Sequence, residues 1–161
     1  LAGNGDFQAG KQENSYIQLW DEKLHLDRLE QLGWYDRPVE LLVLSTCRSG
    51  LGDELIKYGF AGSAVQAGVK SVLASLWYIS DEGTLGLMAE FYSQLRTAPI
   101  KAEALRQAQI AMIKGQVRWE GDRLRTSTMS IPLPPELVQT EDKNLSHPYY
   151  WSGLTMIGNP W

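Results

Sequence analysis

The chain has 161 residues and carries 15 Lys and Arg against 19 Asp and Glu, a formal net charge of -4. Its length fits one domain with a sizeable core, so we expect a single domain over 1–161. The negative balance gives no basic footprint for nucleic acid, and no apolar run approaches the roughly 20 residues of a membrane helix. We therefore expect no direct nucleic-acid partner and no membrane association.

The chain contains one cysteine, Cys47. A single cysteine excludes an internal disulfide framework and a cysteine-rich zinc site, and we expect neither a metal nor another cofactor. It fits a reducing setting, so we expect a cytoplasmic protein. The chain opens with Leu1 rather than Met and shows no signal peptide, which favours a piece of a longer protein.

The first third of the chain predicts short elements. The opening "LAGNGDF" indicates a glycine-rich turn around Asn4. Residues 15–20 and 23–26 indicate two short strands. A short helix should follow, capped by Asp27 and ended by Gly33.

Two apolar runs predict strands that are buried on both faces. The first is "VELLVLST", residues 39–46, and the second is "KSVLASLWYIS", residues 70–80. Between them a helix should begin at Asp53 and end at Gly68.

Two helices are predicted next. Ser80 should cap the first, with Asp81 and Glu82 in its first turn, where acidic groups are favoured. Pro99 separates it from the second helix, which Gly115 should end. Helical spacing predicts the core residues of both: Leu85, Met88, Phe91, Tyr92 and Leu95, then Ala102, Leu105, Ala108, Met112 and Ile113.

The last part combines a polar segment with a strand. Residues 116–146 are polar and contain three prolines, so we expect a long mobile excursion that starts with a hairpin around Glu120-Gly121. His147 should begin the last strand, which runs through 150–157. The order of strands and helices predicts an α/β fold with a largely parallel sheet.

Cys47 permits two interpretations. A lone cysteine is most often a buried, inert thiol. Cys47, however, follows a strand, where sites gather in parallel sheets, and precedes a helix whose N-terminus would favour a thiolate. Gly50 and Gly52 would let the chain pass close to a substrate.

Neither nucleotide binding nor a histidine partner for Cys47 finds much support in the sequence. Gly50 and Gly52 begin a dinucleotide-binding fingerprint, but Leu55 takes its third glycine position and no P-loop lysine is present. The two histidines, His25 and His147, could serve as bases, but packing or surface roles suit both better. Spacing alone therefore gives Cys47 no partner.

The ordered motifs resemble the CHAT domain, a caspase-like cysteine peptidase domain often found behind TPR repeats. "VELLVLSTCRSGLGDE" resembles the family's cysteine motif. The stretch "GFAGSAVQAGVKSVLASLWYISDEGTLGLMAEFYSQL" resembles its Ser-Leu-Trp strand and Phe-Tyr helix, "KAEALRQAQIAM" its next helix, and "HPYYWSGLTMIGNPW" its closing strand. The resemblance implies a three-layer α/β/α sandwich with a mostly parallel sheet, of which the chain is the C-terminal part and whose first strands precede Leu1.

The resemblance also implies roles for individual residues. Cys47 would be the nucleophile, and "LAGNGDF" places Asn4 at the family's catalytic histidine and Gly5 at the glycine that offers an oxyanion N–H. Asparagine cannot take a proton from a thiol, so general acid–base catalysis would be lost. Ser45, Trp77 and Asp81 would line the substrate pocket, although a first-turn helix acid is the better reading of Asp81.

Two functions remain open. The first is a cysteine endopeptidase, a hydrolase of protein or peptide substrates. The second is a non-catalytic relative that binds peptides or proteins through the same cleft, which Asn4 favours. In either case the resemblance implies upstream TPR or other regulatory domains as partners.

Overall fold

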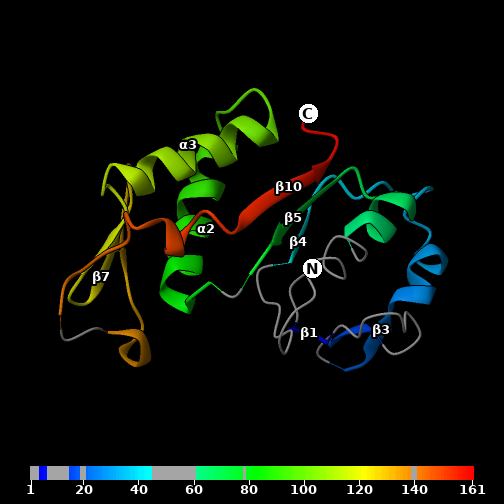
Figure 1. Ribbon diagram of the computed structural model, residues 1–161, viewed down its shortest axis with the longest axis horizontal. Coiled ribbons are helices and arrows are strands. Elements are labelled where there is room, and N and C mark those ends of the chain that lie inside the picture. The colour runs from blue at the N-terminus through cyan, green and yellow to red at the C-terminus, as the bar shows by residue number, and fades with distance from the viewer. Residues whose placement is uncertain (1–3, 7–14, 19–20, 45–60, 78, 139–140) are drawn as a thin grey trace. The chain divides into compact units, whose positions relative to one another are not determined.

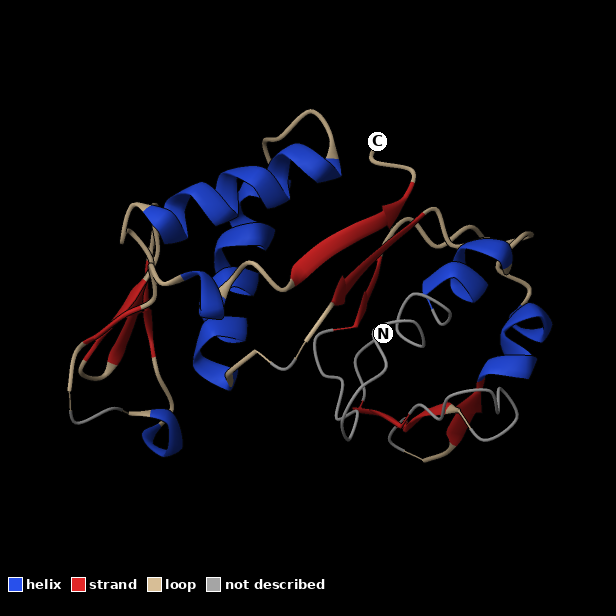
Figure 2. Ribbon diagram, viewed as in Figure 1, coloured by secondary structure: helices blue, strands red, loops and turns tan. Residues whose placement is uncertain are grey.

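The computed structural model describes residues 4–6, 15–18, 21–44, 61–77, 79–138 and 141–161. It divides the chain into two compact units. The first unit comprises Leu1–Tyr78 and Leu154–Pro160, and the second comprises Ile79–Gly153 with Trp161. Figure 1 follows the chain, and Figure 2 separates its helices from its strands. The fold is mixed α/β, as predicted.

A small antiparallel sheet opens the first unit. Strands β1 (Asn4–Asp6), β2 (Tyr16–Gln18) and β3 (Lys23–His25) follow one another in the order β1-β2-β3. The two strands expected in 15–26 are confirmed. The turn expected around Asn4 is wrong, because Asn4–Asp6 pairs with β2 and thereby gives its backbone groups ladder partners that a local reading does not consider.

A 3-10 helix, η2 (Leu26–Leu32), follows directly. It ends at Gly33, which adopts the left-handed conformation with φ 65°, as predicted. Asp27 is not its N-cap: the helix begins at Leu26, with His25 at the N-cap position and no side-chain cap.

The second sheet of the first unit has the order β10-β5-β4. Strand β4 (Leu42–Leu44) runs parallel to β5 (Ser71–Ser75), in which all five residues are buried. These two buried strands were predicted. Residues 61–66 are helical, and Gly68 follows with φ 107°, whereas the expected start at Asp53 lies outside the described residues.

The sheet is not largely parallel in the part of the chain that the structure describes. Strand β10 (Leu154–Gly158) pairs antiparallel with β5, with Leu154 opposite Ser75 and Gly158 opposite Ser71. The chain leaves β5 after Ser75 and returns opposite that residue, so β10 must run the other way. His147 does not begin this strand, which starts at Leu154.

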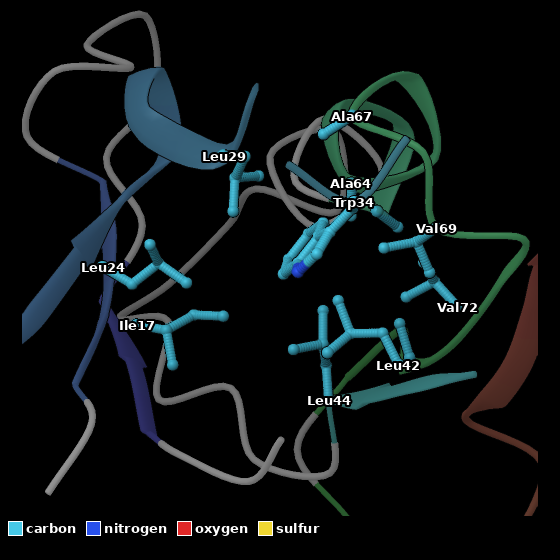
Figure 3. Packing of buried hydrophobic residues seen from close by; sticks show 12 residues of the cluster. Ile17, Leu24, Leu29, Trp34, Leu42, Leu44, Ala64, Ala67, Val69 and Val72 are labelled. Carbon is cyan, nitrogen blue, oxygen red and sulfur yellow. The ribbon is translucent and has the colours of Figure 1, made fainter. Parts of the chain in front are cut away.

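One apolar cluster holds the first unit together. Ile17 and Leu24 come from the small sheet, Leu42 and Leu44 from β4, and Trp34 lies among them (Figure 3). All five are at most 8% exposed. Burying a leucine or isoleucine side chain contributes about 1.5–3 kcal/mol, so this cluster fastens the small sheet to β4 and β5.

Two packed helices form the centre of the second unit. Ser80 caps α2 (Asp81–Leu95) by accepting a hydrogen bond from the Gly83 N–H at 3.1 Å, as predicted. Helix α3 (Lys101–Ile113) packs against α2 (Figure 1). In the part of the chain that the structure describes, no helix has the length and apolarity needed to cross a membrane.

The predicted core faces of the helices are partly wrong. Met88 and Phe91 are buried, but Leu85 and Tyr92 are exposed, and so is Ile113 of α3. In their place α2 buries two glycines and a carboxylate, Gly83, Gly86 and Glu90. A Cβ on Gly83 would lie 2.8 Å from the Tyr150 carbonyl oxygen, so close packing selects this face.

Residues 116–146 contain a folded sheet. Strands β6 (Arg118–Glu120), β7 (Arg123–Arg125), β8 (Ser130–Pro132) and β9 (Lys143–Asn144) follow the order β8-β7-β6-β9. The hairpin predicted at Glu120-Gly121 joins β6 to β7. The expectation of a mere excursion is wrong, because this segment buries Val117, Trp119, Leu124 and Leu145. Two short 3-10 helices, η3 (Pro135–Leu137) and η4 (Pro148–Tyr150), complete the unit.

Candidate active site

Strand β4 positions the chain just before the predicted nucleophile. Leu42 and Leu44 are buried and Val43 is half-buried, so the apolar run anchors the strand on the core. Cys47 is the third residue after Leu44 in the sequence. Cys47 and Ser45 lie outside the described residues, so their placement stays a prediction.

The register of β4 and β5 identifies the sheet edge that matters. Leu44 lies opposite Ala74, so the two parallel strands end at the same edge. The chain leaves β5 there through Leu76 and Trp77, and Trp77 is 37% exposed. An exposed aromatic side chain just past a buried strand can contact a ligand at the carboxyl edge, where ligands bind in open α/β sheets.

Asn4 and Gly5 lie in β1. Asn4 is opposite Gln18 of β2, and Gly5 is opposite Ile17. Ile17 belongs to the same apolar cluster as Leu44. The strand with Asn4 therefore pairs with a strand that shares a core with β4. Because Cys47 lies outside the described residues, the expected closeness of Asn4 and Cys47 stays a prediction.

His25 is on the same small sheet as Asn4 but at another position. It lies opposite Tyr16 of β2, and Tyr16 lies opposite Asp6 of β1. His25 is thus two strands from β1, roughly 10 Å away, and two register positions from Asn4. Its ring lies 5.7 Å from the Tyr16 ring, over which Lys23 Nζ lies at 4.0 Å. These contacts agree with the predicted packing role for His25.

His147 has a local structural role in the second unit. It is extended, as predicted, and its Nδ1 accepts a hydrogen bond from the Tyr149 N–H at 3.2 Å. This bond caps η4.

Asp81 begins α2 and is exposed. At this position its carboxylate faces the positive end of the helix dipole. Its neighbour Glu82 pairs with Lys143, whose Nζ lies 3.3 Å from Oε1. A hydrogen bond with the Glu82 backbone lowers the pKa of the Glu82 carboxyl, and the Ser80 hydroxyl and Lys143 add to this. The helix start is thus an acidic terminus, as the alternative reading of Asp81 held.

Sequence reasoning missed a polar cluster in the second unit. Glu90 is fully buried, and its carboxylate accepts hydrogen bonds from Gln94 Nε2 at 2.7 Å and from the Ser127 N–H at 2.8 Å. The only signal in the sequence is an acidic residue next to the buried Phe91 on a helix. The described residues contain no group of three or more His, Cys, Asp and Glu arranged to hold a metal ion.

The family model described as "CHAT domain" matches residues 1–159, nearly the whole chain. No curated protein matches the chain, and no solved structure does.

Proposed function

Because the chain belongs to the CHAT domain family, a caspase-like, peptidase-related family, we propose that it is a cysteine endopeptidase domain with Cys47 as the nucleophile. The match over 1–159 together with the motif "LSTCRSG" carries this proposal. A caspase-like three-layer sandwich is the proposed finer fold. The parallel pair β4 and β5 supports it, whereas the antiparallel β10 departs from it.

The proposed reaction is peptide hydrolysis. The Cys47 thiolate attacks the scissile carbonyl carbon, and the N–H groups of Gly5 and Cys47 stabilise the oxyanion. The amine then leaves with a proton, and water releases the acyl group from Cys47. Ser45 and Trp77 are proposed to line the pocket for the substrate.

Asn4 removes the proton transfer from this scheme. A thiolate can form without a base if a helix N-terminus lowers the thiol pKa. An asparagine cannot, however, donate a proton to the leaving amine. We therefore propose that this chain turns peptides over poorly as it stands. General acid–base catalysis typically contributes about 10²–10⁴-fold, and this is the loss we expect.

The alternative is a non-catalytic module that binds a peptide or protein through the same cleft. Asn4 favours it. The local contacts of His25 and His147 favour it too, because each histidine has a local structural role of its own. Upstream TPR or other regulatory domains and a cytoplasmic setting belong to both proposals.

Restoring the histidine is the direct test. Asn4→His in the full-length protein should raise cleavage of a peptide library by about 10²–10⁴-fold, because proton transfer to the leaving amine becomes possible. Asn4→His combined with Cys47→Ala is the matched control and should be silent.

Two outcomes would contradict the proposal. If the natural protein already cleaves efficiently and Cys47→Ala abolishes this, another residue is the base, and His25→Ala and His147→Ala would identify it. If Asn4→His stays silent on a broad library while the protein still captures a peptide, the binding module stands instead.

A further inference from the structure

The second unit contains a cavity on the polar face of its sheet. It has a volume of about 380 Å³ and is lined by residues 116, 118 and 125–130. This lining includes two arginines, Arg118 and Arg125, and no acidic side chain. The cavity belongs wholly to the second unit and is separate in sequence from Cys47 and Asn4.

The two arginines lie side by side. Arg118 of β6 is opposite Arg125 of β7, and both contact Glu120: Arg118 Nη2 lies 2.7 Å from Oε1, and Arg125 Nε lies 3.0 Å from Oε2. The side chains of the arginines are 40% and 47% exposed. One carboxylate thus holds two guanidinium groups together and neutralises one of their charges.

Arg125 keeps donors for a ligand. Its contact with Glu120 uses Nε, and within the described residues its two terminal nitrogens donate no hydrogen bond. A guanidinium offers five N–H donors in a planar fork, which matches a carboxylate. Arg118 has fewer N–H donors left for a ligand, since its Nη1 also donates to the Gly115 carbonyl at 3.2 Å.

The rim of the cavity is fixed before any ligand arrives. The Ser127 N–H donates to Glu90 of α2, and the Ser127 hydroxyl does so as well. The Thr126 Oγ1 accepts from the Met129 N–H at 3.0 Å, and the Thr128 hydroxyl lies 3.0 Å from that of Ser93. A loop held by a buried carboxylate loses little entropy on binding, which favours affinity.

We propose that this cavity binds an acidic segment of a polypeptide, with one of its carboxylates paired to Arg125 and the charge of Arg118 beside it. Glu120 neutralises one of the two arginine charges, and the charge that remains favours an anion, although the whole chain is negative. Met129, 44% exposed at the rim, offers an apolar contact to a neighbouring peptide side chain. Recognition is through side chains, because Pro132 on the edge strand β8 has no N–H to pair with an added strand.

The test titrates the full chain carrying Cys47→Ala with a capped peptide, acetyl-Ala-Glu-Leu-Glu-Ala-amide, and follows heat and backbone amide NMR shifts. The Cys47→Ala background prevents cleavage, so the result does not depend on the proposed peptidase function. We expect shifts at Arg125 and at residues 126–130. We also expect Arg125→Gln to weaken binding by about 10–100-fold, since a charge-assisted hydrogen bond contributes about 1.5–3 kcal/mol.

Three comparisons make the test specific. Arg106→Gln is the matched control, because Arg106 is an exposed α3 arginine that pairs with Glu103, and it should leave binding unchanged. Glu120→Gln should strengthen binding several-fold by removing the internal competitor. The peptide with both glutamates replaced by glutamine should not bind.

The proposal is overturned if the glutamine peptide binds as tightly as the acidic one, or if Arg106→Gln and Arg125→Gln weaken binding equally. Inorganic phosphate is titrated separately. If phosphate produces the same shifts and the peptide produces none, the cavity is a site for a small anion and the peptide assignment is wrong.

Discussion

The two units of this protein are stabilised around opposite kinds of centre. The first unit surrounds an apolar cluster of short elements, with Leu42 and Leu44 of β4 at 1% and 6% exposure. The second unit also has apolar residues, but it buries the carboxylate of Glu90 and fastens a loop to it. An apolar centre tolerates any partner that fills space, whereas a buried carboxylate requires particular donors at particular distances. The second unit should therefore respond to chemical changes that preserve volume, and the first should not.

The largest effects should come from deleting a buried side chain at either centre. Glu90→Ala leaves the Ser127 N–H, the Ser127 hydroxyl and the Gln94 amide without their acceptor, so we expect the free energy of unfolding to fall by about 3 kcal/mol. Leu42→Ala in the first unit removes volume alone and should cost about 2–5 kcal/mol. Chemical denaturation measures both.

Substitutions that keep volume sharpen this comparison. Leu42→Met should cost less than about 1.5 kcal/mol, because it changes shape but not chemistry. Glu90→Gln keeps the size of the side chain but removes the charge and turns one acceptor into a donor, so it should cost most of what Glu90→Ala costs. If Glu90→Gln is as harmless as Leu42→Met, the two centres do not differ as we argue.

A smaller effect is expected from three helical glycines. Gly83→Ala should cost about 1–3 kcal/mol, because its Cβ would meet the backbone of Tyr150, which cannot turn aside. Gly86→Ala meets the tips of Leu145 and Val117 at 2.8 and 3.0 Å, which can shift, so it should cost less. In the first unit Gly62 has nothing within 4 Å, and Gly62→Ala should stabilise by about 0.5–1 kcal/mol through helix propensity.

Urea unfolding of the three variants ranks them. The expected order of stability is Gly62→Ala, then Gly86→Ala, then Gly83→Ala. Equal stability of Gly62→Ala and Gly83→Ala would show that α2 is not closely packed against η4.

The smallest effect concerns the pH dependence of the second unit. Hydrogen bonds in the folded state hold the pKa of Glu82 below its ordinary value of 4.5. Stabilisation by Glu82 is therefore present above that value and is lost as the pH falls through the lowered folded value. Glu82→Gln should make the decline in stability shallower below about pH 5, by about 1 kcal/mol or less, since the pair with Lys143 is partly exposed.

Thermal melts of the wild type and Glu82→Gln from pH 7 down to about pH 3 check this. Lys143→Gln is the companion variant. It should be less stable than the wild type at neutral pH, and this difference from the wild type should become smaller at acid pH. An identical acid profile for the wild type and Glu82→Gln would contradict the role given to this carboxylate.

The sequence by itself determined the elements whose pattern is local. The two buried strands, the Ser80 cap, the end of η2 at Gly33 and the hairpin at Gly121 were all predictable, because each depends on residues close together in the chain. The ordered motifs also identified the family over nearly the whole length. For the candidate site they named Cys47 and Asn4, of which the structure describes only the strand position of Asn4.

Only the tertiary structure decided which partners the elements take. The direction of β10, the pairing of Asn4–Asp6 with β2 and the sheet within 116–146 each depend on contacts between distant residues. The clearest case is α2. A hydrophobic pattern cannot assign glycines and a glutamate to a core face, yet Gly83 and Gly86 are buried because neighbouring chain packs directly on them. Glu90 is buried because Ser127, 37 residues away, supplies the hydrogen bonds that a carboxylate out of water requires.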